Sequence, residues 1–353
     1  MIEQPKTLII LSPGFPANEE DTTCLPAQQS FARSLNKIFP EIKIIILSFQ
    51  YPYSKSTYTW NNNKVISFGG KNRRKLYRLQ IWRRVWLKLK SLNEQENIIG
   101  ILSFWCTETA LIGKSFAKKN KLKHFCWILG QDARKGNRMI RLINPQPQEL
   151  IAMSDSLATE FFDNYKIFPL HIVPNGIEPN LFSSIKSEKD IEISGVGSLI
   201  HLKRYDIFIT VVKKIKEKFP SLKAALCGKG AEEKKLKSLI QKFDLENNIT
   251  ITGEIAHNDV LKIMQRSKIF LHTSSYEGFS GACLEALYAG AHVISFCNPV
   301  NQNIDHWHIV KTEKEMFTKA IELLNNPLTE FTPVLPFTME DTVKKIMSLI
   351  IDN

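Results

Sequence analysis

Two glutamates separated by seven residues, Glu277 and Glu285, enclose a glycine-rich stretch that reads EGFSGACLE. The apolar run IFLHTS precedes it as an expected strand, and ACLEALYA follows as a helix that Gly290 can end. Gly278 and Gly281 permit backbone conformations and close approaches that a side chain would prevent. Amides at a helix N-terminus bind phosphate, and a carboxylate accepts hydrogen bonds from ribose hydroxyls. The spacing therefore predicts a nucleoside diphosphate site; the alternative is that both glutamates are ordinary surface acids.

A lysine follows another expected strand, in the stretch GVGSLIHLKRYD at residues 195–206. The strand should end at Val196 and Gly197, and a helix should begin near Tyr205. A lysine at the edge of a sheet and beside a helix N-terminus can bind phosphate as a point charge. Lys203 is therefore a second candidate; the alternative is a solvated pair of Lys203 and Arg204 on a surface loop.

Short apolar runs alternate with helix-period segments along the chain, and near-continuous apolar strands form parallel sheets that helices cover on both faces. Two such series meet at PNGIEPNLF, residues 174–182. They predict an α/β protein of two doubly wound, Rossmann-like domains facing each other across a cleft. The expected domains are 1–175 and 176–335, with a last helix in 336–353 that returns to the first domain. Asn258 is the expected N-cap of the segment HNDVLKIMQR.

Composition bounds the class of protein. A length of 353 residues suits two domains, and a hydrophobic fraction of 43% is ample for two cores. No run of 18 apolar residues is present, and the first apolar stretch, LIILS, is too short for a signal peptide. Six cysteines without C-x-x-C spacing suit reduced thiols. We therefore expect a cytoplasmic protein.

The net charge of +12 is concentrated in the first half of the chain: residues 1–175 hold 25 basic and 13 acidic residues, whereas residues 176–353 hold 22 of each. Residues 71–92 predict a basic helix. Its expected apolar side comprises Leu76, Leu79, Trp82, Trp86 and Leu89, extended by Ile81 and Val85, although Lys75 and Arg78 interrupt it. This pattern is typical of peripheral binding to an anionic membrane surface; the alternative is a core helix with a basic outer face. Nucleic acid is not an expected partner, because no recognised nucleic-acid motif accompanies the charge.

Five motifs, in their order along the chain, resemble those of retaining glycosyltransferases of the GT-B fold, family 4 (glycosyl transferases group 1). They are PNGIEPNLF, GSLIHLKRYD, LCGKG, the stretch from Glu277 to Glu285, and its sequel LEALYAGAHVIS; SDSLATEFF resembles a further family segment. The resemblance covers residues 150–295 well and the first 150 loosely. It implies transfer of a hexose-type sugar from a nucleotide-sugar donor, with UDP or GDP as the expected nucleotide, to a glycan or lipid-linked acceptor. The N-terminal domain would take the acceptor and the C-terminal domain the donor.

The resemblance also implies roles for single residues. Lys203 would contact the donor diphosphate, with Arg204 beside it, and Glu285 would bind the ribose. Glu277 would lie against the transferred sugar, so Lys203 and Glu277 are the expected catalytic residues. Phosphate or ribose would meet the backbone amides of Gly281, Ala282, Cys283 and Leu284.

Two contacts with the donor would come from backbone elsewhere. Ile255, just past Gly253, would border the base. Gly14, in the loop SPGFPAN after the first strand, would let that loop approach the diphosphate from the other domain.

The sequence departs from the family pattern at two places. Ser198 stands where the family often has an arginine, a charge that Arg204 could replace. The segment LGQDARKGN lacks the histidine that the family commonly places near the donor sugar. In that segment Gln131 could hydrogen-bond a sugar hydroxyl, while Asp132 could contact the acceptor or simply cap a turn.

We expect neither a metal nor a cofactor beyond the nucleotide sugar, because no D-x-D follows a strand and the eight histidines form no convincing ligand set. Lys203 and helix amides would then stabilise the departing diphosphate. The resemblance implies front-face attack without a protein nucleophile. The alternatives are a nucleotide-sugar epimerase of the same fold and a nucleotide-sugar-binding protein that has lost turnover.

Overall fold

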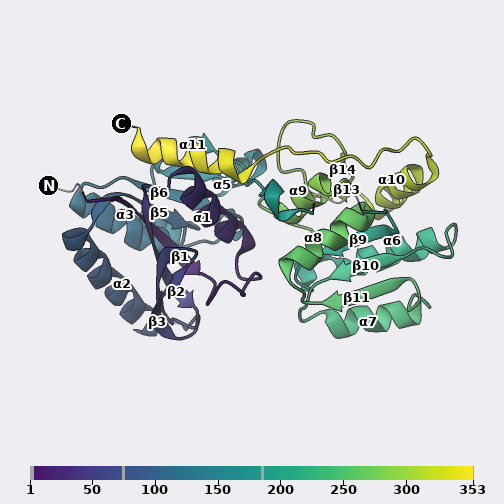
Figure 1. Ribbon diagram of the computed structural model, residues 1–353, viewed down its shortest axis with the longest axis horizontal. Coiled ribbons are helices and arrows are strands. Elements are labelled where there is room, and N and C mark those ends of the chain that lie inside the picture. Colours follow the sequence, from purple (N-terminus) through teal and green to yellow (C-terminus); the bar gives the residue numbers. More distant parts are fainter. Residues whose placement is uncertain (1–3, 74–75, 184–186, 353) are drawn as a thin grey trace. The chain divides into compact units, whose positions relative to one another are not determined.

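The computed structural model describes residues 4–73, 76–183 and 187–352. The chain forms two compact units, Met1–Gly176 together with Thr338–Asn353, and Ile177–Phe337. The sequence predicted divisions after residues 175 and 335, and the structure divides the chain after Gly176 and after Phe337. Each unit has its own sheet (Figure 1). Each also has its own apolar core.

The first unit contains an eight-stranded sheet. Its strands, in spatial order, are β3 (Lys55–Trp60), β4 (Asn63–Phe68), β2 (Lys43–Tyr51), β1 (Lys6–Gly14), β5 (Asn97–Phe104), β6 (His124–Ile128), β7 (Leu150–Ala152) and β8 (His171–Ile172). Neighbouring strands are parallel except β3 and β4, which form an antiparallel hairpin that the sequence analysis missed. Strand order reverses between β1 and β5, the kind of switch point where doubly wound sheets bind ligands.

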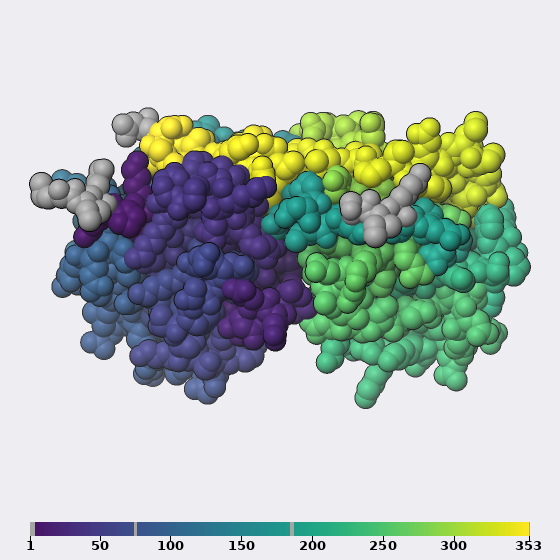
Figure 2. Space-filling view, viewed as in Figure 1, coloured from purple at the N-terminus to yellow at the C-terminus, as the bar shows by residue number. Residues whose placement is uncertain are grey.

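Helices cover this sheet. They are α1 (Pro26–Ile38), α2 (Leu76–Gln95), α3 (Glu108–Asn120), α4 (Met139–Ile143), α5 (Asp155–Tyr165) and α11 (Met339–Ile351). Thr338 caps α11 by accepting a hydrogen bond from the Asp341 amide at 3.0 Å. Helix α11, drawn in yellow, lies along α1 (Figures 1 and 2). An ion pair of 2.6 Å between Lys37 and Glu340 joins the two helices.

The basic segment at residues 71–92 forms α2 from Leu76 onward, and residues 74–75, including Lys75, lie outside the described residues. The apolar side expected for this helix is confirmed except in its first turn: Ile81, Val85 and Leu89 are buried, and Trp82 and Trp86 pack against the core, but Leu76 and Leu79 were wrong. Its buried residues are Ile81, Val85, Leu89 and Leu92, whereas Leu76 and Leu79 are 75% and 53% exposed. The error concerns the start of the helix, because the four buried positions follow the spacing of a stripe that packs on a sheet and this stripe begins only at Ile81. Helix α2 is therefore a core helix with a basic outer face.

The second unit contains a six-stranded, fully parallel sheet. Its strands, in spatial order, are β11 (Ile249–Gly253), β10 (Ala224–Cys227), β9 (Ile191–Val196), β12 (Ser267–His272), β13 (His292–Ser295) and β14 (Trp307–Ile309). The switch point lies between β9 and β12. The helices of this unit are α6 (Tyr205–Lys216), α7 (Glu233–Lys242), α8 (His257–Arg266), α9 (Gly281–Tyr288) and α10 (Glu313–Asn325). The prediction that Asn258 caps α8 was wrong, because the helix already begins at His257.

The glycines of LCGKG hold two loops in backbone contact. Gly228 has a φ of +144°, and a Cβ at this position would lie 2.0 Å from the carbonyl oxygen of Gly197. The loops after β9 and β10 therefore touch through backbone alone, which only glycine permits. No helix among the described residues is long and apolar enough to cross a membrane.

Candidate active site

The candidate site is built on two loops that leave the carboxyl ends of β9 and β12, on either side of the switch point of the second unit. A short 3₁₀ turn, His201–Lys203, lies between β9 and α6. The other loop fixes this turn, because the Thr273 hydroxyl donates to the Lys203 carbonyl at 2.7 Å and the Ser275 amide donates to the Leu202 carbonyl at 3.0 Å. Lys203 is thereby placed opposite the loop that carries Glu277.

Glu277 lies at the centre of a polar cluster. Lys203 Nζ forms an ion pair with Glu277 Oε1, and each of the two side chains is 20% exposed. The same oxygen accepts from Ser274 Oγ at 3.3 Å and lies 3.4 Å from His272 Nε2. Burial acts to raise the pKa of the Glu277 carboxyl, but the His272 hydrogen bond and the Lys203 charge outweigh it and hold this pKa at about 2. Glu277 is therefore ionised throughout the neutral range.

His272 contacts Glu277 through its Nε2 and was not singled out from the sequence. Its Nδ1 lies 2.8 Å from Ser295 Oγ on β13, and its ring is buried. Burial lowers the pKa of this imidazole, although Glu277 acts to raise it, so the ring is neutral near pH 7. In a neutral ring that donates from Nε2 to Glu277, Nδ1 carries no proton and faces the Ser295 hydroxyl as an acceptor. The signal was present in FLHTS, where the histidine ends the strand before the loop.

Glu285 faces a second histidine. Its Oε1 lies 2.7 Å from Nε2 of His257, the first residue of α8, and the two side chains are 18% and 17% exposed. Both are therefore half-buried and still reachable from solvent. Sequence reasoning chose Glu285 but missed His257, which stands in the stretch IAHNDVL just beyond Gly253.

The N-terminus of α9 is capped from within the loop. The side chain of Ser280 accepts a hydrogen bond from the amide of Cys283, and its carbonyl accepts from the amide of Leu284 at 3.3 Å. Among the four amides expected to meet the donor, this leaves Gly281 and Ala282 as the stronger candidates. The Cys283 thiol is buried, and burial raises its pKa, so this cysteine packs rather than reacts.

The remaining candidates of the second unit lie close to this cluster in the chain. Arg204 has a φ of +50° and pairs with Asp206 at 3.5 Å, directly after Lys203. Ser198 is exposed in the loop after β9. Ile255 is half-buried between the end of β11 and the start of α8, two residues before His257.

The candidates of the first unit have different surroundings. Gly14 is the last residue of β1, where a Cβ would contact that of Tyr51 at 3.4 Å. Gln131 is exposed at the start of a 3₁₀ turn, Gln131–Ala133, after β6. Asp132, beside it, is buried and accepts from the amides of Cys106 at 2.7 Å and Gly130 at 2.9 Å. Of its two expected roles, this favours the capping of a turn.

No group of three His, Cys, Asp or Glu side chains in the described parts of the chain is placed to hold a metal ion. The stretch from Asp305 to His308 instead contributes two rings to a stack. Both rings stack on His292, whose ring centroid lies 4.1 Å from that of His306 and 5.3 Å from that of His308.

Comparison with known proteins points to one enzyme class. Residues 177–327 match the family model described as glycosyl transferases group 1. The phosphatidylinositol N-acetylglucosaminyltransferase gpi3 subunit of Schizosaccharomyces pombe is 24% identical over 203 residues, which are 56% of this chain and 44% of that protein. An uncharacterized glycosyltransferase of Methanocaldococcus jannaschii is 24% identical over 277 residues, 70% of this chain and 67% of that protein. The chain spans less than half the length of the first curated relatives that it matches.

The likeness to solved structures extends over both units. The Anabaena protein HepE in complex with UDP and glucose superposes with a TM-score of 0.70 at 15% identity, covering 99% of this chain and 96% of that one. At this identity the likeness speaks for the fold. The chain thus has the GT-B fold of glycosyltransferases, and its residues 177–327 carry the sequence pattern of the glycosyl transferases group 1 family.

Proposed function

We propose that this chain is a retaining, metal-independent glycosyltransferase of family 4. It moves a hexose-type sugar from a nucleotide-sugar donor to a glycan or lipid-linked acceptor. The observation that carries the proposal is the cluster at the switch point of the second unit. There the ion pair of Lys203 and Glu277 and the pair of Glu285 and His257 stand at the carboxyl edge of one sheet.

Each pair supplies one part of donor binding. Lys203 leaves Glu277 for the donor diphosphate, whose two negative charges attract it more strongly than one carboxylate does. Glu285 accepts hydrogen bonds from the ribose hydroxyls in place of His257. The amides of Gly281 and Ala282 and the dipole of α9 add positive potential beside the phosphates.

The reaction needs charge stabilisation more than a protein nucleophile. The bond from the sugar C1 to the phosphate oxygen breaks, and a bond from C1 to the acceptor oxygen forms on the same face. The proton of the acceptor hydroxyl passes to the leaving phosphate oxygen. Lys203 and the α9 amides stabilise the negative charge on the diphosphate as it departs. Glu277, held ionised and freed from Lys203, accepts hydrogen bonds from hydroxyls of the transferred sugar.

The charge of the first unit favours an anionic or lipid-linked acceptor, taken up by the N-terminal unit at the surface of an anionic membrane. The outer face of α2 carries exposed Arg83, Arg84 and Lys90 beside exposed Leu79 and Leu87. Basic side chains interleaved with leucines suit peripheral binding to anionic headgroups. Sedimentation with anionic vesicles tests this surface; absence of binding at low salt, or equal binding of Arg83→Glu/Arg84→Glu, would count against it.

A thermal-shift titration with UDP, GDP, ADP and CDP, each with and without EDTA, tests the donor site. A ligand that binds only the folded state stabilises it by roughly 2.7 kcal/mol at a hundredfold excess over its dissociation constant. We expect a selective shift with UDP or GDP that EDTA does not remove. No shift with any nucleotide would overturn the proposal, and a shift abolished by EDTA would overturn its metal-independent form.

Product analysis separates the remaining alternatives. A glycosylated acceptor supports the proposal, an epimerised donor indicates an epimerase, and an unchanged donor indicates a binding protein without turnover. Nothing in the comparisons favours the epimerase.

A further inference from the structure

His272 is the buried histidine at the end of β12, and its two ring nitrogens have different partners. Nε2 lies 3.4 Å from Glu277 Oε1, and Nδ1 lies 2.8 Å from Ser295 Oγ on β13. Because the ring is buried, it exchanges hydrogen bonds with these two groups of the protein. Its protonation state therefore depends on what the two partners can donate and accept.

The Ser295 hydroxyl has more partners than one proton can serve. Besides His272 Nδ1, it lies 3.0 Å from the Cys297 carbonyl oxygen, and it accepts from the Cys297 amide at 3.0 Å. A hydroxyl has one proton, so it can donate to a neutral His272 or to the Cys297 carbonyl, but not to both. An imidazolium removes this conflict. It donates from Nδ1 to Ser295 and from Nε2 to Glu277, and Ser295 then donates to Cys297.

Two charged side chains act on the His272 ring and oppose each other. Burial, the largest influence, and the Lys203 ammonium lower the pKa of the imidazole, whereas Glu277 raises it. Lys203 is paired with Glu277, so the charges of the ammonium and the carboxylate largely offset each other at the ring. Burial then decides the outcome, and the ring is neutral as long as this ion pair is intact.

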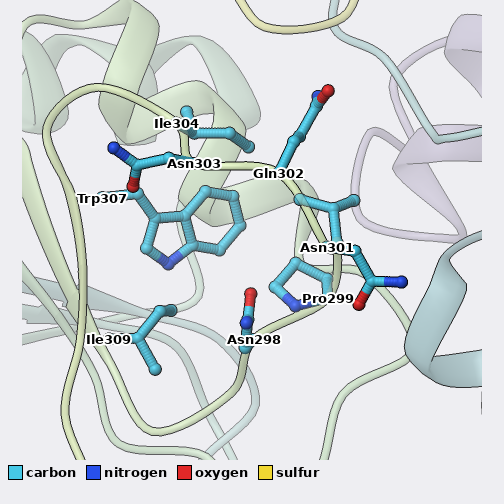
Figure 3. A pocket seen from close by; sticks show the side chains of 9 residues that line it. Asn298, Pro299, Asn301, Gln302, Asn303, Ile304, Trp307 and Ile309 are labelled. Atoms are coloured by element: carbon cyan, nitrogen blue, oxygen red, sulfur yellow. The ribbon is translucent and has the colours of Figure 1, made fainter.

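The cavity beyond the carboxyl end of β13 adds no charge to this balance. Its volume is about 200 Å³, and residues 298–304, Trp307 and Ile309 line it (Figure 3). None of these nine residues is ionisable. Burial raises the pKa of the Cys297 thiol, which precedes them in the chain, to about 11, so this group is neutral as well. The protonation of His272 therefore follows Glu277 and Lys203.

Donor binding should reverse the charge balance around His272. In the proposed function Lys203 turns from Glu277 to the donor diphosphate, which brings two negative charges. One ammonium then stands against a carboxylate and a diphosphate, where it had stood against the carboxylate alone. A net negative environment favours the charged form of an imidazole. The hydrogen bonds for that form are already in place.

We propose that His272 takes up one proton from solvent when the donor draws Lys203 away from Glu277. The imidazolium replaces the lysine as the cation beside this carboxylate, and it keeps Glu277 oriented toward the transferred sugar. His272 is thus a positioning residue, which acts on the sugar through Glu277. The inference rests on the proposed function, because it requires Lys203 to bind the donor diphosphate.

Calorimetric titration in buffers of equal pH and different ionisation enthalpy counts the protons taken up on binding. The ligand is the nucleotide sugar of the base that gives the largest thermal shift, because its diphosphate exchanges no proton near pH 7. We expect the wild type to take up more protons than His272→Gln, by a difference of up to one. Glutamine retains an N–H that can donate to Glu277, but it does not titrate.

The pH dependence of donor affinity measures the same proton in a second way. A complex that binds one proton more than its free components is favoured as the pH falls. The wild type should therefore bind the donor up to about tenfold more tightly for each unit from pH 8 down to pH 6. His272→Gln should lose this slope. A histidine with a merely structural role would change affinity or stability without changing the slope.

Two other histidines of this unit are distinguished by control and by sign. His201 is exposed in the turn that carries Lys203, so His201→Gln is the matched control and should keep the proton uptake. His257 would lose Glu285 to the ribose. A histidine that loses a carboxylate partner can only release a proton, which is opposite in sign to the uptake expected of His272.

Glu277→Gln decides the question if His272→Gln does not fold. It retains His272 but removes the carboxylate that attracts the proton, so the uptake should be lost. The inference is overturned if the wild type and His272→Gln take up equal numbers of protons, or if Glu277→Gln takes up as many as the wild type. Absence of any nucleotide binding overturns the proposed function and this inference together, whereas binding without these differences overturns this inference alone.

Discussion

The two units are both doubly wound, although their sheets differ in strand number, and they use their carboxylates in different ways. Both sheets reverse strand order next to their first strand, and both carry acidic side chains just beyond strand ends near that point. In the first unit these are Glu108 after β5 and Asp132 after β6. In the second unit they are Glu277 after β12 and Glu285 in α9. Position in the fold therefore does not separate acids that bind a ligand from acids that hold the structure.

Their partners do separate them. Glu108 is buried and accepts from Gln50 Nε2 and Arg78 Nε, each at 2.5 Å, and from Trp82 Nε1 at 2.7 Å. These bonds tie α2 to the start of α3. Asp132 is bound by backbone amides, which cannot turn away from it. A carboxylate in such a setting has no capacity left for a ligand.

Glu277 and Glu285 each face a side chain that a ligand can replace. Lys203 is on a flexible stem and can turn to a diphosphate, and His257 is half-buried at the start of a helix. Both glutamates retain about a fifth of their surface. Partial exposure together with a side-chain partner that can move away is the signature that distinguishes the second unit.

Loss of catalysis is the largest effect that we expect. Lys203→Ala and Glu285→Ala should each reduce sugar transfer by about 10²–10³-fold, because each removes a group that holds the donor in the transition state. Initial rates with the nucleotide sugar found by thermal shift measure this. Lys237→Ala, which removes an exposed lysine of α7, is the matched control. Near-normal rates in either variant would contradict the view that the second unit uses these groups to bind a ligand.

Asp132→Ala should act on the fold instead. It leaves the amides of Cys106, Gly130 and Leu129 without their acceptor, so we expect a loss of about 3 kcal/mol in the free energy of unfolding. Denaturant unfolding measures it, with the exposed Asp163→Ala as control. Nucleotide affinity should be retained in the folded protein. A stable variant that has lost transfer activity would instead assign Asp132 to the acceptor.

Much of the architecture could be predicted from the sequence, because continuous apolar runs indicate buried parallel strands. The hairpin of β3 and β4 could not, since KSTYTW and NKVISF alternate or mix polar residues at a sheet edge. For α2 the buried residues Ile81, Val85 and Leu89 were predicted, but the limits of the buried face were not. The pattern also included Leu76 and Leu79, and only the packing of the helix against its unit shows that these two leucines are exposed.

The candidate site was predictable to the extent that glycine spacing and charge reveal it. Lys203 and Glu277 were both chosen, and the structure brings them together. The contacts of Glu277 with His272 and of Glu285 with His257 were missed. His272 ends the strand just before Glu277 and was visible in FLHTS, whereas His257 lies 28 residues before Glu285, and one sequence carries no record of that pairing.

The ionised state of Glu277 should be visible in the pH dependence of stability. Its folded pKa of about 2 lies below the ordinary value of 4.5. Its contribution is therefore complete above about pH 4.5 and is lost as the pH falls toward 2. The difference in free energy of unfolding between wild type and Glu277→Gln should shrink over this window, by on the order of 2–3 kcal/mol. Parallel stability curves from pH 6 to pH 2 would show that Lys203 and His272 do not hold this charge.

Arg204 gives the smallest expected effect and tests where the binding cluster ends. Its guanidinium is 39% exposed and only loosely paired with Asp206, so it is not held toward the site as Lys203 is. We expect Arg204→Ala to weaken nucleotide binding about two- to fivefold, as for an exposed charge of 0.2–1 kcal/mol. Alanine retains a Cβ at the same positive φ, so the change isolates the charge from the backbone, and Arg204→Lys should restore most of the affinity. Calorimetric titration in low salt measures the difference. An unchanged affinity would show that Arg204 is a solvated surface residue without a role in nucleotide binding. A hundredfold loss would show that it replaces the charge that Ser198 does not supply.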